Sequence, residues 1–191
     1  MRIIAGECRG RTLLAPPGQV TRPTADRVRQ ALFDTLAHAS WAGADRLRGA
    51  HVLDGFAGTG ALGLEALSRG AASALFVERD RAALRCLRDN VRGCGLQDRA
   101  MIRACDMLRL PPRGAAAPAD LVFLDPPYNQ DLPTRALSVL ERGGWLHADT
   151  LIVVETAAAE AAPVPAPRLL LERRHGAACL YAWRHGTDDN G

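Results

Sequence analysis

Several kinds of residue and segment are scarce or absent in this 191-residue chain. Lysine is missing, so arginine supplies all 24 basic residues, and aromatic residues make up only 5% of the chain. No stretch approaches the about 18 uninterrupted apolar residues that a transmembrane helix needs. The N-terminus shows no hydrophobic region of the kind found in signal peptides, so we expect a protein that is neither exported nor bound to a membrane.

Cysteine is present but arranged in a way that excludes two classes of protein. The five cysteines are odd in number and widely spaced, at Cys8, Cys86, Cys94, Cys105 and Cys179. No pair has the C-x-x-C spacing, so neither a zinc site nor a disulfide framework is expected, and we predict no bound metal. Reduced thiols of this kind are typical of a cytoplasmic protein.

The pattern of apolar segments indicates one α/β domain with a short extension. The length suits a single domain with a substantial core. Segments that read as strands alternate with segments that read as helices, which predicts a parallel, doubly wound sheet. We divide the chain into a basic N-terminal extension (residues 1–40), a linker (41–50), a catalytic domain (51–185) and a disordered tail (186–191).

The most informative segment is the tetrapeptide Asp125-Pro126-Pro127-Tyr128, which follows an apolar run at residues 121–124. The run predicts a buried strand, and the two prolines end that strand and stiffen the chain after it. A carboxylate, rigid carbonyl groups and an aromatic ring are therefore expected at the carboxyl end of a strand. Open α/β sheets bind their ligands at this edge.

These groups together suit a planar amine. Its N–H groups can donate to Asp125 and to the carbonyl of Pro126, while its ring stacks on Tyr128. Such an amine is a weak nucleophile because its lone pair is delocalised, and fixed acceptors would direct the lone pair toward an electrophile. The tetrapeptide predicts methylation of an exocyclic or amide nitrogen, and the alternative is a strand-ending turn with an exposed tyrosine.

A glycine-rich turn upstream predicts the cofactor site. A short apolar strand leads into Asp54-Gly55-Phe56-Ala57-Gly58-Thr59-Gly60 and then into a helical pattern. Gly58 and Gly60 can adopt positive φ and let the backbone approach a ligand closely. Asp54 would repel the pyrophosphate of a dinucleotide but suits the ammonium of a methionyl group. We therefore expect S-adenosylmethionine ahead of other nucleotide ligands.

Two further acids follow the next predicted strands. Glu78 ends the apolar run at residues 74–77, where an acid can accept hydrogen bonds from both ribose hydroxyls. Asp106 ends residues 101–105 and could accept from an adenine amine, with Met107 under the ring. Each acid alone reads more simply as a solvated carboxylate at a strand end. Four acids closing four successive strands favour a common site.

The positive charge is concentrated at the N-terminus. Residues 1–30 hold six arginines and two acids, a net charge of +4, whereas residues 31–191 hold 18 arginines and 19 acids, a net charge of −1. A basic extension on a neutral core indicates a nucleic-acid substrate, and the alternative is a solvated charged face. The predicted contacts are Arg9 and Arg11 at the tip of a hairpin formed by residues 3–6 and 12–14, and Arg22 and Arg27 around the first turns of a helix.

The C-terminal third carries weaker signals. Residues 131–142 read as a helix, residues 151–155 as a strand, and residues 169–171 and 178–183 as two antiparallel strands around His175-Gly176. His175 is a candidate for catalysis, although a histidine in a hairpin turn is more often structural.

The chain resembles the bacterial 16S rRNA guanine-N2 methyltransferases of the RsmD type over residues 2–184. The matching stretches are R-I-I-A-G-x-x-R-G-R at residues 2–11, R-P-T-A-D-R-V-R at 22–29, D-G-F-A-G-T-G-A-L-G-L-E-A-L-S-R-G at 54–70, and D-P-P-Y at 125–128. The D-P-P-Y motif is shared by many amino-methyltransferases, whereas the first two stretches are more specific.

This resemblance implies a Rossmann-like class I methyltransferase, with a mostly parallel seven-stranded sheet, a C-terminal antiparallel hairpin and a small N-terminal hairpin and helix. It implies S-adenosylmethionine as methyl donor, one guanine of 16S rRNA within a small-subunit assembly as substrate, and a monomer. The implied cofactor residues are Asp54, Phe56, Gly58 and Gly60 for the methionyl end, Glu78 for the ribose, and Asp106 and Met107 for the adenine. Asp125, Pro126, Pro127 and Tyr128 are the implied catalytic residues.

Three other functions stay open at the level of sequence. Methylation of a protein glutamine uses a related motif, but with asparagine in place of Asp125. Methylation of adenine or cytosine in DNA shares D-P-P-Y but commonly adds a target-recognition domain. An assembly factor that only binds RNA would keep the arginines and tolerate the loss of Asp54 or Asp125. The sequence does not identify which guanine is modified, or whether free or assembled rRNA is the substrate.

Overall fold

The computed structural model of the chain describes residues 1–17, 23–42, 46–128, 131–165 and 168–186, and of residues 23–26 only the backbone. Its strands are β1 (His51–Gly55), β2 (Ser73–Glu78), β3 (Ala100–Ala104), β4 (Ala119–Leu124), β5 (Leu146–Ala157), β6 (Leu171–His175) and β7 (Ala178–Arg184). Its helices are α1 (Pro23–His38), α2 (Ala61–Ser68), α3 (Arg81–Cys94) and α4 (Leu132–Arg142), with short 3-10 turns η1 (Gln97–Arg99) and η2 (Met107–Arg109).

The strands form a seven-stranded sheet in the order β3-β2-β1-β4-β5-β7-β6. Strands β1 to β5 pair in parallel, while β7 runs antiparallel to both β5 and β6. The predicted fold class, a mostly parallel Rossmann-like sheet with a C-terminal antiparallel hairpin, is confirmed. The strand order reverses direction between β1 and β4, and sheets of this kind bind ligands outside the carboxyl ends of the strands at such a point.

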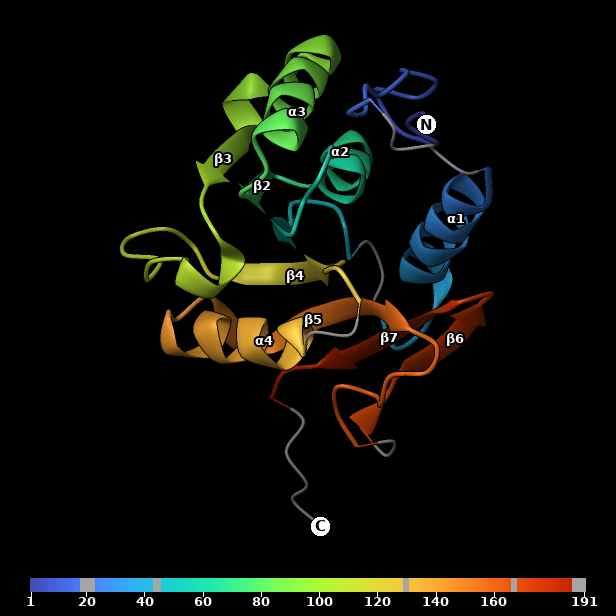
Figure 1. The fold of residues 1–191 in the computed structure, drawn as a ribbon, viewed down its shortest axis with the longest axis vertical. Coiled ribbons are helices and arrows are strands. Elements are labelled where there is room, and N and C mark those ends of the chain that lie inside the picture. Colours follow the sequence, from blue (N-terminus) through green and yellow to red (C-terminus); the bar gives the residue numbers. More distant parts are fainter. Residues whose placement is uncertain (18–22, 43–45, 129–130, 166–167, 187–191) are drawn as a thin grey trace.

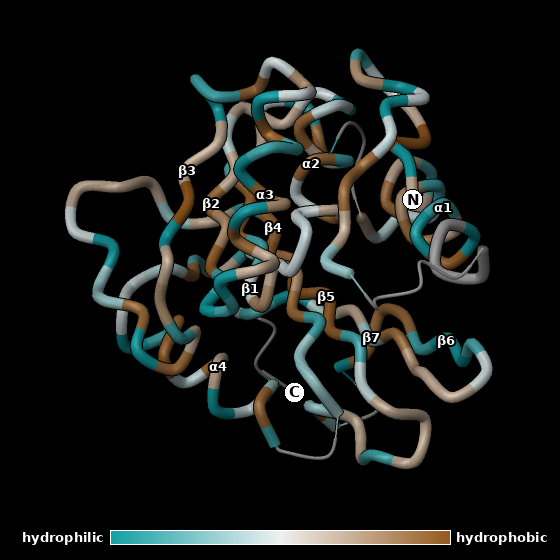
Figure 2. Tube along the Cα trace, turned by 45° about the horizontal axis from the view of Figure 1, so that its top comes forward, coloured by the Kyte–Doolittle hydropathy of each residue, from teal (hydrophilic) through white to brown (hydrophobic). Residues whose placement is uncertain are grey.

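Strand residues alternate between two hydrophobic cores. Leu121 and Phe123 of β4 pack in the core shared with α1, α2 and α3, whereas Val122 and Leu124 pack in the core shared with α4. The helices therefore cover both faces of the sheet, with α2 and α3 on one side and α4 on the other (Figure 1). The hydrophobic segments gather in the strands at the middle of the molecule (Figure 2).

The N-terminal extension contacts the core in two places: its helix α1 packs on the sheet, and its first residues pack on α2. Phe33 of α1 contacts Phe123 of β4, with ring centroids 5.6 Å apart, and Arg69, directly after α2, lies over Phe33. At the other end of the extension, the backbone of Gly6 touches the last turn of α2 so closely that a Cβ there would lie 1.8 Å from the carbonyl oxygen of Ser68. Gly6 also has φ 82, so the position requires glycine for two reasons.

The N-terminal hairpin is shorter than the predicted arms at residues 3–6 and 12–14. An antiparallel bridge joins Arg2 to Thr12, and the amide of Ile3 donates to the carbonyl oxygen of Arg11. The amides of Ile4 and Ala5 do not join a strand, because both donate to the buried carboxylate of Glu65 at 2.8 and 3.0 Å. Residues 4–10 consequently form the turn.

Two boundaries in the C-terminal half also differ from the prediction. Strand β5 begins at Leu146, five residues before the expected start at residue 151, because Leu146 already pairs with Ala119 across an irregularity in β4. Strand β6 begins at Leu171, at the end of the expected segment, and extends to His175. Within the described residues, no helix is both long and apolar enough to span a membrane.

Candidate active site and nucleic-acid interface

The glycine-rich loop between β1 and α2 has an unusual backbone. Phe56, Gly58 and Gly60 have φ values of 60, 55 and 81. A bulky residue such as Phe56 rarely adopts positive φ, and strained positions of this kind concentrate at functional sites. The loop is held in place by hydrogen bonds from the amide of Ala57 to the carbonyl oxygen of Val77 and from the amide of Gly60 to that of Ala57.

Asp54 lies at the end of β1 with 1% of its surface exposed. One carboxylate oxygen, Oδ2, accepts a hydrogen bond of 2.9 Å from the amide of Gly63 in the first turn of α2. No other hydrogen bond to this carboxylate is found among the described residues. Burial, with added repulsion from Asp125 and Glu78, raises the pKa of Asp54 to about 8, although the bond from Gly63 opposes this change.

Glu78 closes β2 and holds the glycine-rich loop from the side. Its Oε2 accepts from the amide of Gly58 at 2.7 Å, and its Oε1 accepts from the amides of Arg79 and Asp80, each at 2.7 Å. Three backbone donors fix the carboxylate while leaving acceptor capacity on Oε2. Glu78 is therefore a rigid acceptor beside Gly58, in the place where the sequence predicts the ribose.

Asp106 and Met107 follow β3 and begin the turn η2. Oδ1 of Asp106 accepts from the amide of Leu108 at 3.0 Å, and Oδ2 pairs with the guanidinium of Arg79 at 2.8 Å. The bond from Leu108, together with Arg79, lowers the pKa of Asp106. Met107 is buried, and its sulfur lies 3.0 Å from the position that a Cβ on Gly55 would occupy. The space beside Gly55 is thus filled by neighbouring side chains.

The predicted amine-binding tetrapeptide lies directly after β4. Asp125, Pro127 and Tyr128 are exposed, whereas Pro126 is buried. Desolvation, followed by repulsion from Glu155, raises the pKa of Asp125 to about 7. Solvent reaches this carboxyl group, yet the surrounding protein is dense enough to disfavour its charged form. Asp125 and Asp54 also repel one another, so the structure brings the two acids to the same edge of the sheet.

Glu155 is a residue of this edge that the motifs do not identify. It lies near the end of β5, and its Oε1 accepts a hydrogen bond of 2.6 Å from the hydroxyl of Tyr128. Burial and this bond raise the pKa of Tyr128, so the phenol stays protonated. In the sequence Glu155 looks like an ordinary strand-end residue, and only its position beside β4 shows that it faces the tetrapeptide.

Several acidic side chains meet at the carboxyl edge of the sheet. Asp54 is repelled by Asp125 and Glu78, and Asp125 by Glu155, and the causes that shift the pKa values of Asp54 and Asp125 include no cation. A cationic ligand would relieve this repulsion. S-adenosylmethionine carries an ammonium and a sulfonium, so the acids of this edge suit it. No group of three or more metal-ligating side chains is found in the described part of the chain.

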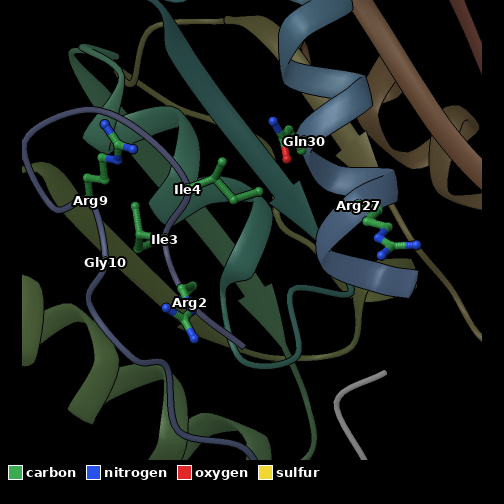
Figure 3. A pocket seen from close by; sticks show the side chains of 7 residues that line it. All are labelled: Arg2, Ile3, Ile4, Arg9, Gly10, Arg27 and Gln30. Atoms are coloured by element: carbon green, nitrogen blue, oxygen red, sulfur yellow. The ribbon is translucent and has the colours of Figure 1, made fainter. Parts of the chain in front are cut away.

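The arginines predicted to contact nucleic acid lie in the N-terminal extension. Arg9 and Arg27 line a pocket of about 330 Å³ between the N-terminal hairpin and α1, together with Arg2, Gln30, Gly10 and the apolar side chains of Ile3 and Ile4. Figure 3 shows Arg2 and Arg9 on the hairpin and Arg27 and Gln30 on the helix. Arg11 is exposed on the hairpin. Arg22 lies outside the described residues, as do residues 187–191 of the predicted tail.

Two buried polar residues of the core, Glu65 and Asn90, hold this extension in place. Glu65 is fully buried and, besides Ile4 and Ala5, it binds Arg69 at 2.7 Å and lies 4.0 Å from Arg29. Asn90 of α3 accepts from the amide of Leu14 and donates to the carbonyl oxygens of Leu14 and Thr59. Asn90 therefore joins the extension to the glycine-rich loop. The sequence did not reveal either role. The one available signal was the position of Glu65 within a short and otherwise apolar helix, where a glutamate is expected to be buried with a partner.

The chain is similar to several known proteins. The family model described as "Conserved hypothetical protein 95" matches residues 1–184. Ribosomal RNA small subunit methyltransferase D of Escherichia coli (strain K12) is 41% identical over 167 residues, which cover 87% of this chain and 80% of that protein.

Two solved structures extend the comparison to the fold. The structure of yhhF from Escherichia coli has a TM-score of 0.81 and 36% identity, covering 98% of this chain and 99% of its own. An RNA methyltransferase from Salinibacter ruber in complex with S-adenosyl-L-homocysteine has a TM-score of 0.59 and 17% identity, covering 89% and 95%. At that identity the second structure supports the fold alone.

Proposed function

The chain belongs to the conserved hypothetical protein 95 family, and within it to the RsmD-type methyltransferases, and we propose that it methylates the exocyclic N2 amine of one guanine in 16S rRNA. The methyl donor in this proposal is S-adenosylmethionine. The observation that carries the proposal is the group of carboxylates at the carboxyl edge of β1, β2, β4 and β5, with an aromatic ring beside them. A cationic donor and a planar amine both suit these acceptors.

Six residues are proposed to hold the donor. S-adenosylmethionine, when bound, supplies an electrophilic methyl group on a sulfonium. Asp54 binds the methionyl ammonium through the oxygen not used by Gly63, with the backbone of Gly58 and Gly60 beside it. Glu78 accepts from the ribose hydroxyls, and Asp106 accepts from the adenine amine over Met107. Positioning of the reactants accounts for most of the acceleration in this proposal.

Asp125 and Tyr128 are proposed to hold the guanine. Asp125 and the carbonyl of Pro126 accept hydrogen bonds from the N2 amine, while Pro127 stiffens the segment that carries Tyr128. The base stacks on the ring of Tyr128, and Asp125 takes the amine proton once the nitrogen is methylated. A base that reaches Tyr128 has left its helical stack, so the proposal includes base extrusion.

The N-terminal extension is proposed to bind the RNA backbone. Arg2, Arg9 and Arg27 surround one pocket, and no ion pair to these side chains is found within the described residues. In contrast, Arg29 and Arg69 nearby are engaged with Glu65. Cations left without acidic partners on a concave surface suit phosphate groups. The arginines of this extension therefore divide into those that fix the fold and those available for RNA.

The proposal is tested by identifying the methylated nucleoside. The protein is incubated with methyl-labelled S-adenosylmethionine and either free 16S rRNA or small subunits from a strain lacking the enzyme, and the digested RNA is analysed by mass spectrometry. We expect N2-methylguanine at one position. Asp125→Ala should abolish most of the labelling while keeping cofactor affinity, and Asp125→Asn should retain more activity because its amide oxygen still accepts.

Two results would contradict the proposal. Label in adenine or cytosine, in RNA or DNA, would assign the enzyme to another nucleobase amine. Label in a protein glutamine would move the substrate out of the nucleic acids.

A further inference from the structure

Asp125, directly after β4, and Glu155, within β5, lie at the same level of the sheet. Strands β4 and β5 pair in parallel with Leu124 opposite Val154, so Asp125 and Glu155 each come next in the chain after this pair. Adjacent strands lie about 4.8 Å apart. Repulsion between the two carboxyl groups follows from this arrangement, and Glu155 is the charged group that disfavours ionisation of Asp125.

Glu155 also determines how Tyr128 is held. The phenol hydroxyl donates to Oε1 of Glu155 at 2.6 Å, although 37% of the tyrosine surface is exposed. A hydrogen bond to a carboxylate is about twice as strong as one between neutral groups. An exposed ring without this bond would be free to rotate, so the contact fixes the orientation of the ring before any base arrives.

We propose that Glu155 is a positioning residue for methyl transfer, which holds the Tyr128 ring as the stacking surface for the target base and strengthens Asp125 as an acceptor of the amine proton. The inference rests on the proposed function, since it assigns a part in amine methylation to a residue outside the D-P-P-Y motif. Glu155 itself touches neither the donor nor the base in this proposal.

The electrostatic surroundings of Asp125 are consistent with this role. The groups that face it are Asp54 from β1, Glu155 from β5 and Tyr128 from its own segment, and Glu160 adds to the negative field at Tyr128. Desolvation, with added repulsion from Glu155, raises the pKa of Asp125 to about 7 in the free protein. Its carboxylate is consequently a stronger proton acceptor than an ordinary one, but it can take the amine proton only after it has lost its own.

The test compares single-turnover rates across pH for wild type, Glu155→Gln, Glu155→Leu and Tyr128→Phe. In Glu155→Gln the amide oxygen still accepts from Tyr128 but the charge is gone, so the acid limb of the profile should move to lower pH while the rate on the alkaline plateau changes little. Bound donor shifts the limb in every variant, so the comparison is among variants.

Glu155→Leu removes the charge and the acceptor together. We expect the same movement of the acid limb and a fall of roughly tenfold or more in the plateau rate, the factor for losing one hydrogen bond to a charged group. Tyr128→Phe should reproduce the fall without moving the limb as far as either Glu155 variant. Cofactor affinity, measured by calorimetry, should stay at the wild-type value in all three.

The matched control is Glu172→Gln, which removes one negative charge from an exposed residue of β6. Its profile should coincide with wild type. A Glu155→Gln profile that also coincides with wild type, or a Tyr128→Phe rate equal to wild type, would overturn the inference while leaving the methyltransferase proposal intact. Failure of the wild-type protein to methylate RNA would instead overturn the proposed function.

Discussion

At the scale of residues, the carboxyl group of Asp54 lowers the stability of the free protein, although it is proposed to bind the donor. It is buried at the end of β1, and burial raises its pKa to about 8. An acid whose pKa is higher in the folded than in the unfolded chain binds more protons when folded. Its contribution to stability therefore falls as the pH rises from about 4, the unfolded value, to about 8.

The replacement Asp54→Asn should reverse this penalty in the free protein. We expect the free energy of unfolding to depend less steeply on pH between about 5 and 8. At pH 8 it should be higher than in wild type by about 1–2 kcal/mol, a gain that is common when a buried ionisable residue of a functional site is replaced by a neutral one. Urea denaturation without ligand measures both quantities. Affinity for S-adenosylmethionine should fall in the same variant. The control is Asp98→Asn at an exposed acid, and an Asp54→Asn slope equal to wild type would contradict the prediction.

A second residue, Glu78, combines a loop contact with the proposed ribose contact. Glu78→Ala should weaken binding of S-adenosylmethionine by about 1–3 kcal/mol, because the ribose hydroxyls and the amide of Gly58 both lose their acceptor. Glu78→Gln should weaken it less, since one oxygen still accepts. Calorimetry on the folded variants measures the difference. Unchanged affinity in Glu78→Ala would remove this residue from the cofactor site.

At the scale of elements, α2 connects the glycine-rich loop to the N-terminal extension. In its first turn the amide of Gly63 donates to the carboxylate of Asp54. In its last turn the side chains of Glu65 and Ser68 accept hydrogen bonds from backbone amides of the N-terminal extension. Eight residues of helix separate these ends by about 12 Å. The helix after the glycine-rich loop thus joins the N-terminal extension to the proposed cofactor site.

Removal of the Glu65 carboxylate should break this connection. In Glu65→Ala the amides of Ile4 and Ala5 lose their acceptor and the guanidinium of Arg69 loses its buried partner, so we expect a loss of about 3–5 kcal/mol in unfolding free energy. Limited proteolysis should cleave the extension before the core. Asp89→Ala, which breaks an exposed ion pair with Arg92 on α3, is the control and should cost less than about 1 kcal/mol. Equal losses in the two variants would contradict the assigned role.

At the scale of the whole molecule, the acids of the sheet edge and the arginines of the N-terminal extension lie in different places. Acids gather at the carboxyl edge of the sheet, while arginines without acidic partners among the described residues gather on the N-terminal hairpin and α1. This division suits two ligands, a cationic methyl donor at the acids and an RNA whose polyanionic backbone lies against the arginines. We expect the two regions to contribute separately to affinity for donor and RNA.

The double substitution Arg9→Ala/Arg11→Ala tests this separation. Each lost phosphate contact lowers the slope of log K against log [salt] by about 0.7–0.9, so RNA affinity should fall and its salt dependence should flatten. Cofactor affinity should be unchanged, because the cofactor residues follow His51 in the chain. Arg85→Ala/Arg88→Ala on the exposed side of α3 removes the same charge and serves as control. An unchanged slope in the Arg9/Arg11 variant would show that these arginines form a solvated charged face and do not contact RNA phosphates.

The local sequence determined the backbone scaffold of this protein. Short apolar runs that end in acids predicted β1 to β4, and the glycines at positions 58 and 60, together with the prolines at 126 and 127, predicted where the chain must turn. These features succeed because backbone conformation depends on residues close together in the chain. The fold class and the edge that carries the acids followed from them.

Only the tertiary structure decided the partners of the buried polar side chains. Glu65 meets Ile4 across 61 positions, Asn90 meets Leu14 across 76, and Tyr128 meets Glu155 across 27. Arg29 contributes to the positive charge of the extension in the sequence, yet in the fold its guanidinium donates to the carbonyl oxygen of Arg2 and is buried. A polar residue that loses water on burial takes the partner that packing brings to it. That partner depends on which elements the sheet order makes neighbours, which no local pattern specifies.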